Sequence, residues 1–310
     1  MAGNSLFCHF RIEGPKHLST SETRRPTLMV IHAHPDDEAS QTGGTLARYA
    51  AAGFRTVLVT CTDGRQGNGV DGCKPGHRDH RPEQIAARRS HELAMSKVAL
   101  GISDLVQLDY PDSGMPESAN DTDPRAFSRL EGEPITLQLE ALMRKYQPDV
   151  VVTYPPNGLS NHPDHVRTHE LTVAAFGRIR KAGGLPAGRD GETGPERRMP
   201  KLYYIALSVS RLKAARTRAE ATLGPGIWTP PLEIGVDDDS ITTAVNISGF
   251  WAHKLRALAA HASQADASAL LRVLNVTGQE NPVEEYILAD PPWSGGEQES
   301  DLFQGIVGGS

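Results

Sequence analysis

Cysteine, long apolar runs and an excess of positive charge are scarce or missing in this 310-residue sequence. Its three cysteines, Cys8, Cys61 and Cys73, are too few for a disulfide framework, so we expect a protein of the reducing cytoplasm. No segment approaches the roughly 18 apolar residues of a transmembrane helix, so we expect no integral membrane segment. The net charge of -6 argues against a nucleic-acid partner.

The composition that remains is that of a globular protein with many loops. Hydrophobic residues make up 38% and charged residues 23%, and the chain carries 30 glycines and 22 prolines. We expect a polar N-terminal tail at residues 1–26, a single domain at 27–290 and a loose C-terminal tail at 291–310. The N-terminal tail lacks the apolar core of a signal peptide.

Short apolar segments rich in β-branched residues alternate with segments of helical period. Strands are expected at residues 27–32, 55–60, 105–109, 149–154, 202–207 and 241–247, and helices at 44–52, 84–100, 134–146, 163–180 and 251–262. This alternation predicts an α/β fold, a Rossmann-like and mostly parallel sheet with helices on both faces. In such folds the site lies at the carboxyl ends of the strands.

Two polar segments follow the first and fourth expected strands. Residues 33–38 read Ala-His-Pro-Asp-Asp-Glu, and residues 162–165 read His-Pro-Asp-His. Each alone could be a capped helix start, because acidic residues favour that position. On one edge of a parallel sheet, however, their imidazoles and carboxylates would converge into a divalent metal site. The residue types alone leave open whether Asp36 or Asp37 binds the metal.

Such a site would suit hydrolysis. Two histidines and one carboxylate leave a coordination position open for water, and zinc bound in this way lowers the pKa of that water to about 7. A carboxylate that is not a ligand can then accept the proton. The same nitrogen and oxygen ligands also accept iron(II).

These two segments resemble the LmbE-like/PIG-L family of zinc-dependent N-deacetylases. Further similarity lies in Thr62–Gly64, Arg89–Glu92, Leu108–Met115 and Lys254–Gln264. Within the family, Val166–His169, Lys201–Tyr204 and the C-terminal part are most similar to the branch that holds the mycothiol-pathway deacetylase and mycothiol-conjugate amidase. The resemblance covers roughly residues 27–290.

The resemblance implies roles for individual residues. Zinc, one ion per chain, would be bound by His34, Asp37 and His165. Asp36 would be the general base, and His162 would stabilise the oxyanion or protonate the leaving amine. Arg89 and Asp112 would contact hydroxyl groups of the sugar, and Asp164 would orient a ligand histidine.

The function expected from this resemblance is removal of the acetyl or another acyl group from the amide nitrogen of an N-acetylglucosamine-type amino sugar or glycoside. One alternative is an amidase of the same family that cleaves a larger thiol-sugar conjugate. Another is a catalytically silent sugar-binding protein, against which the intact histidines and aspartates argue. A nucleotide-binding protein is disfavoured because no Gly-x-Gly-x-x-Gly follows the first strand.

One departure from the branch concerns the residues just before His162. Ser160 and Asn161 stand where the mycothiol-type enzymes usually carry Tyr-Gly. Serine is too short to copy the reach of that tyrosine. The acyl group, the aglycone and the oligomeric state do not follow from the sequence.

Overall fold

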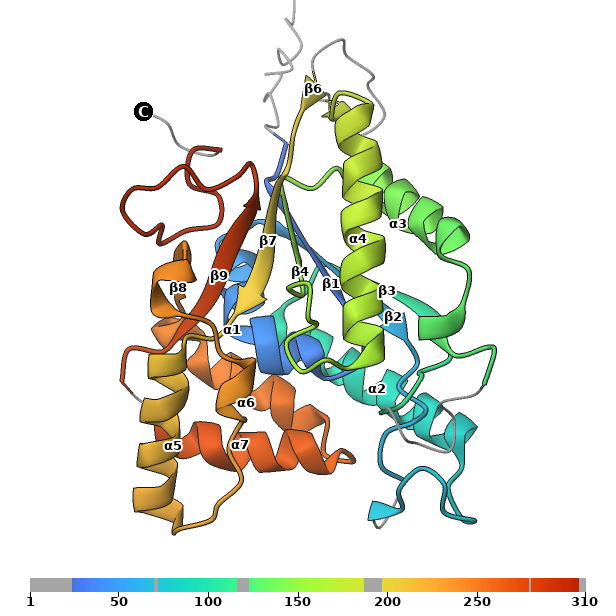
Figure 1. Ribbon diagram of the computed structural model, residues 1–310, viewed down its shortest axis with the longest axis vertical. Coiled ribbons are helices and arrows are strands. Elements are labelled where there is room, and N and C mark those ends of the chain that lie inside the picture. Colours follow the sequence, from blue (N-terminus) through green and yellow to red (C-terminus); the bar gives the residue numbers. More distant parts are fainter. Residues whose placement is uncertain (1–23, 70–71, 116–122, 187–196, 279, 307–310) are drawn as a thin grey trace, which may run out of the picture.

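A seven-stranded sheet forms the centre of the computed structural model, which describes residues 24–69, 72–115, 123–186, 197–278 and 280–306 (Figure 1). The strand order is β3-β2-β1-β4-β7-β9-β8. The strands of this sheet are β1 (Thr27–His32), β2 (Arg55–Thr62), β3 (Asp104–Tyr110), β4 (Val150–Thr153), β7 (Lys201–Ala206), β8 (Thr243–Asn246) and β9 (Val283–Asp290). The pairs from β3 to β7 are parallel, whereas β9 and β8 add an antiparallel edge. A separate antiparallel pair joins β5 (Leu185–Pro186) to β6 (Arg197–Arg198).

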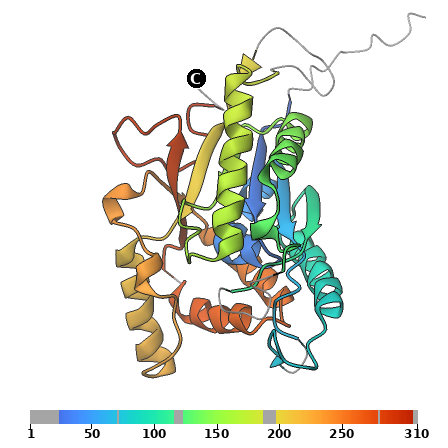
Figure 2. The same cartoon turned by 45° about the vertical axis from the view of Figure 1, so that its right-hand side comes forward.

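Helices cover both faces of the sheet. They are α1 (Asp37–Ala51), α2 (Pro82–Leu100), α3 (Gly132–Tyr146), α4 (Pro163–Lys181), α5 (Val209–Leu223), α6 (Trp251–Ala260) and α7 (Ala265–Thr277). Met29 and Ile31 of β1 belong to one hydrophobic core with residues of α3 and α4, and α4 runs along that face in both views (Figures 1 and 2). Leu28 and Val30 belong to the opposite core with residues of α1, α2 and α6.

The alternation of side chains along β1 explains why its four inner residues, Leu28–Ile31, are all apolar. Successive side chains of a strand point to opposite faces, so a strand covered on both sides needs apolar residues at nearly every position. Every residue of β1 and of β4 is buried. The predicted α/β fold, with a mostly parallel sheet between helices, is confirmed.

The structure differs from the sequence prediction at the C-terminal end. Residues 291–306 are not a loose tail, because Leu302 and Phe303 are 0% and 2% exposed. The Phe303 ring lies 5.0 Å from the ring of Tyr49 and 4.7 Å from that of Phe54, which joins the segment to α1 and the turn after it. Burial of these apolar rings holds the segment on the domain.

Other helices and strands also differ from the sequence prediction. α1 begins at Asp37, seven residues before the predicted start at Gly44, and α5, α7 and β9 were not predicted. The predicted N-terminal tail lies outside the described residues up to position 23, and the domain boundaries remain a prediction. None of the helices within the described part of the chain is long and apolar enough to cross a membrane.

Candidate active site

The loops that follow β1 and β4 meet at one edge of the sheet. These two strands pair directly, with Leu28 opposite Val150, so the chain leaves both strands side by side. His34 follows β1, and α1 begins three residues later. His162 and His165 stand at the start of α4, where Pro163 fits the first turn because its missing N–H needs no partner there.

Three donor atoms of the predicted metal ligands form a small triangle. His34 Nδ1 lies 3.1 Å from His165 Nε2, and Asp37 Oδ2 lies 3.5 Å from each of these nitrogens. Four ligands placed tetrahedrally around zinc at about 2.05 Å are about 3.3 Å apart, so the triangle has the size that such a site requires. The described residues also include two other groups of three possible donors that share His34: one with His162 and His165, and one with Asp112 and Asp164.

The remaining nitrogen of each histidine in the triangle has its own polar partner. His34 Nε2 lies 3.2 Å from Asp164 Oδ2 and 3.5 Å from Asp112 Oδ1. His165 Nδ1 lies 3.0 Å from the carbonyl oxygen of Gly158. Acceptors at these positions hold a proton on His34 Nε2 and on His165 Nδ1. They leave His34 Nδ1 and His165 Nε2, the two nitrogens of the triangle, free to bind a metal.

Opposite charges gather around His34. Burial lowers the pKa of this imidazole, but the carboxylates of Asp112, Asp164 and Asp37 outweigh burial and raise the pKa well above its ordinary value. The pKa of Asp37 is held well below its ordinary value because His165 and His34 outweigh the effect of burial. The site therefore has an excess of negative charge that a cation would balance.

Asp36 lies beside this triangle and has different partners. Its Oδ2 accepts a hydrogen bond from Arg89 Nη2 at 2.8 Å. Burial raises the pKa of Asp36 to about 6, against the opposing effect of Arg89. The carboxylate is therefore charged at pH 7 and can accept a proton.

The two predicted sugar contacts are engaged within the protein. Arg89 is only 4% exposed and also donates to the carbonyl oxygens of Pro35 and Gly64. Asp112 accepts hydrogen bonds from the backbone N–H groups of Gln66 and Gly114 at 3.1 and 2.8 Å. Their roles in substrate binding remain predictions.

His162 caps α4 with its side chain. Its Nδ1 accepts the backbone N–H of Asp164 at 3.1 Å, so the proton of the neutral ring is on Nε2. Burial, together with His34 and His165, lowers the pKa of His162 to about 2. The ring is therefore neutral at pH 7 and offers one N–H donor.

Tyr154, directly after β4, was not predicted as a site residue. The centroids of its ring and the His165 ring lie 4.3 Å apart in a stacked arrangement, and its hydroxyl accepts the backbone N–H of Ala33 at 3.0 Å. Burial, with the nearby Asp37 carboxylate, raises the pKa of Tyr154 well above its ordinary value. One buried side chain thus interacts with two residues of the triangle. An aromatic residue at the end of an apolar strand reads as core packing, which is why the sequence pattern did not mark it.

Replacing Tyr154 with phenylalanine is expected to weaken zinc binding about 10- to 100-fold, because the hydroxyl that holds the Ala33 backbone next to His34 and interacts with Asp37 is lost while the stacking on His165 is kept. Competition with a chromogenic chelator would measure this affinity. Tyr204→Phe is the matched control, since Tyr204 contacts His169 rather than the triangle. Equal zinc affinity in Tyr154→Phe and the wild type would contradict the orienting role.

The fold and the site together define the class of protein. It is an α/β enzyme of hydrolytic type whose sheet edge carries a cluster of histidines and aspartates able to hold a metal ion. The sequence model of PIG-L, GlcNAc-PI de-N-acetylase, matches residues 29–176. The chain belongs to this family.

Relatives extend the similarity over most of the chain. The 1D-myo-inositol 2-acetamido-2-deoxy-alpha-D-glucopyranoside deacetylase 1 of Frankia casuarinae is 35% identical over 297 residues, covering 90% of this chain and 95% of that protein. The deacetylase of the same name from Kineococcus radiotolerans is 36% identical over 310 residues, with 90% and 83% covered.

Solved structures share the fold at low identity. The N,N'-diacetylchitobiose deacetylase of Pyrococcus horikoshii aligns with a TM-score of 0.54 at 20% identity, covering 84% of this chain and 83% of that chain. GalB, a 4-carboxy-2-hydroxymuconate hydratase of Pseudomonas putida, aligns with a TM-score of 0.57 at 16% identity, covering 88% and 99%. Because a hydratase shares the fold, the reaction must be argued from the site.

Proposed function

We propose that this protein is a zinc-dependent deacetylase that hydrolyses the acetamide of an N-acetylglucosamine glycoside. The supporting observation is the triangle of His34, Asp37 and His165 with Asp36 beside it. The donor atoms of His34, Asp37 and His165 have the spacing of zinc ligands. The carboxylate of Asp36 accepts a hydrogen bond from Arg89 instead, and it stays available to accept a proton. Metal-assisted hydrolysis of an amide combines a Lewis acid with a proton acceptor, and this arrangement offers positions for both.

The roles of the residues follow from these contacts. His34, Asp37 and His165 would hold zinc, which when bound supplies a Lewis acid and lowers the pKa of water. Asp36 accepts the proton of the attacking water and can return it to the nitrogen of the departing amine. Arg89 orients the Asp36 carboxylate. Neutral His162 donates its Nε2–H to the carbonyl oxygen as negative charge develops there.

The contacts of His162 favour the oxyanion role over protonation of the amine. Its Nδ1 is already an acceptor for the backbone of Asp164, so a second proton on the ring would break that hydrogen bond. A neutral donor can stabilise an oxyanion without changing its protonation state.

The substrate class rests on the relatives. Both relatives described above carry the name of a deacetylase acting on an acetamido-glucopyranoside of 1D-myo-inositol. We therefore propose an inositol or similar polyol glycoside of N-acetylglucosamine as the first substrate to examine. A cytoplasmic location remains a prediction from the cysteine content.

The experiment is release of acetate and primary amine from three N-acetylglucosamine substrates, the inositol glycoside, the methyl glycoside and N,N'-diacetylchitobiose. Zinc-loaded wild-type protein is compared with Asp36→Asn as the blank. Zinc-dependent release above the blank is the expected result. No release from any of them, by protein that holds one zinc per chain, would overturn the proposal and favour a larger amide substrate.

A further inference from the structure

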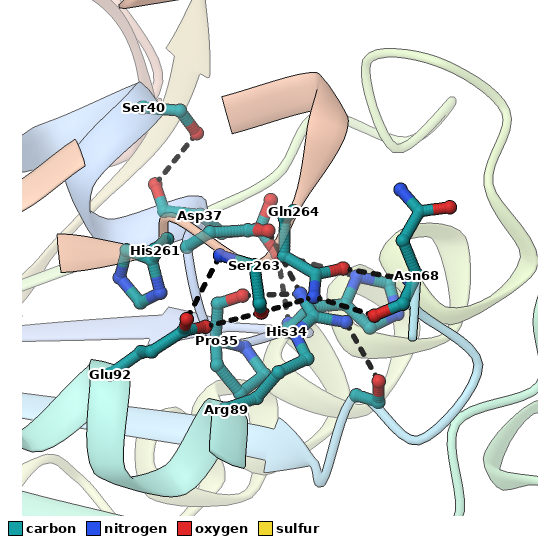
Figure 3. A network of polar contacts seen from close by, with 12 residues as sticks. His34, Pro35, Asp37, Ser40, Asn68, Arg89, Glu92, His261, Ser263 and Gln264 are labelled. Carbon is teal, nitrogen blue, oxygen red and sulfur yellow. Dashed lines mark hydrogen bonds and ion pairs between the residues drawn. The ribbon is translucent and has the colours of Figure 1, made fainter. Parts of the chain in front are cut away.

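The turn after α6 is far from Asp36 in the sequence but lies near it in the structure. Residues 261–264 lie outside the region 29–176 that the family model matches. Figure 3 shows His261, Ser263 and Gln264 close to Glu92, Arg89 and Asn68. Ser263 donates through its backbone and hydroxyl to the Glu92 carboxylate, at 3.0 and 2.8 Å, and Gln264 Oε1 accepts the backbone N–H of Asn68 at 3.0 Å.

His261 is linked to Asp36 through one intervening side chain. His261 Nε2 lies 2.7 Å from Glu38 Oε1, and both side chains are 0% exposed. The other carboxylate oxygen of Glu38 accepts the backbone N–H of Asp36 at 3.0 Å. Ser96 donates its hydroxyl to Glu38 as well. The result is a continuous path of hydrogen bonds from the C-terminal part of the chain to the backbone of Asp36.

Asp36 has a backbone that needs this support. Its φ of 113° and ψ of -23° fall in a region that residues with a side chain rarely adopt. Such a conformation persists only where the surrounding structure holds it. Arg89 fixes the carboxylate end of the residue, and Glu38 fixes the amide end.

We propose that His261 is a positioning residue for Asp36 and acts through Glu38. Its Nε2 locks the Glu38 carboxylate, and the locked carboxylate holds the Asp36 amide so that the side chain faces the site. This inference rests on the proposed role of Asp36 as the base. The competing explanation is a buried pair that only adds stability and does not affect the geometry of Asp36.

Two substitutions of His261 separate these explanations. In the described part of the chain, His261 Nδ1 has no hydrogen-bond partner, so Nε2 performs the polar role of the side chain. His261→Gln places an N–H donor near the position of Nε2, whereas the amide of His261→Asn is too short to reach Glu38. Both variants lose the imidazole, so a difference between them reports the hydrogen bond.

Lys254→Met is the matched control. Lys254 lies on α6 and forms a buried ion pair with Glu284 at 2.6 Å, with side chains 5% and 6% exposed. Its ammonium also bonds to the carbonyl oxygen of Ser40 at 2.7 Å, and none of these contacts involves Glu38 or the Asp36 amide. Loss of this pair is expected to lower stability and to leave kcat unchanged.

The first readout is deacetylation by the zinc-loaded variants. His261→Asn is expected to lower kcat about 10- to 100-fold, the effect of misplacing a reacting group, while KM and zinc content stay at wild-type values. His261→Gln is expected to keep most of the wild-type kcat. In the double variant, which also carries Asp36→Asn, His261→Asn should cause no further loss of rate, because His261 is proposed to act only through Asp36. Wild-type kcat in folded, zinc-loaded His261→Asn would overturn the proposal.

The second readout does not depend on the reaction. Hydrogen exchange of the Asp36 amide, followed by NMR, should be at least about 10-fold faster in His261→Asn than in the wild type or in Lys254→Met, because Glu38 no longer holds this amide. Unchanged protection in His261→Asn would overturn the inference. If the wild type releases no acetate, the proposed function fails, and amide exchange still decides whether His261 holds Asp36.

Discussion

Asp36→Asn is expected to lower kcat by about two to four orders of magnitude, the usual contribution of a general base, while the protein keeps its zinc. Asparagine retains an oxygen that can accept the hydrogen bond from Arg89 Nη2. It also tolerates positive φ better than most residues, so the backbone at φ 113° need not change. Only the ability to take a proton is removed. Initial rates and zinc content per chain, measured on the same sample, test this result.

A second aspartate serves as the control for Asp36→Asn. Asp104 begins β3 at the opposite edge of the sheet and pairs with Arg55 at 2.8 Å. Asp104→Asn makes the same change of charge and should leave kcat unchanged. Turnover of Asp36→Asn within a factor of two of the wild type would remove Asp36 as the base.

His165→Ala is expected to lower zinc affinity by more than about 100-fold, which exceeds the usual loss for a residue that merely orients a ligand. His165 Nε2 is one corner of the triangle, 3.1 Å from His34 Nδ1 and 3.5 Å from Asp37 Oδ2. Removing it leaves two of the three protein donors that a catalytic zinc site needs. Zinc content after dialysis, together with chelator competition, measures the loss.

His169→Ala is the matched control on the same helix, one turn later. His169 Nδ1 lies 2.8 Å from the carbonyl oxygen of Tyr154, and its ring contacts Tyr204. It is not part of the triangle, so this variant should retain zinc. A full zinc complement in His165→Ala would refute the proposed ligand set and direct attention to the group of His34, Asp112 and Asp164.

The parallel part of the sheet could be predicted because its strands contain short apolar runs, such as Leu28–Ile31 of β1 and Val150–Val152 of β4. β9 could not, because it carries Glu284 and Glu285, which are buried at 6% and 8% exposure. Glu284 accepts the backbone N–H groups of Gly44 and Thr45, at 3.0 and 2.7 Å. Two adjacent glutamates in a sequence indicate solvent exposure, and partners about 240 residues away cannot be read from a local pattern.

The site could be predicted in part for a related reason. The segments at 33–38 and 162–165 follow strands of one parallel sheet, and the topology alone brings His34 and His165 together. Tyr154 and Glu38 were not identified because an aromatic residue and a helical glutamate are common in structural roles. Their importance lies in which atoms they contact, and that depends on tertiary packing rather than on residue type.

The contact between Glu38 and His261 spans 223 positions of the chain and has a consequence for biosynthesis. All residues predicted for the site lie at or before His165, so a ribosome has made each of them when little more than half of the protein exists. The amide of Asp36, however, gains its support only after α6 has emerged and closed this long loop. A nascent chain that stops before α6 would therefore carry both histidine motifs and still lack a fixed base. If His261 has the proposed role, such fragments, released by premature termination, would hydrolyse amides more slowly than the whole chain.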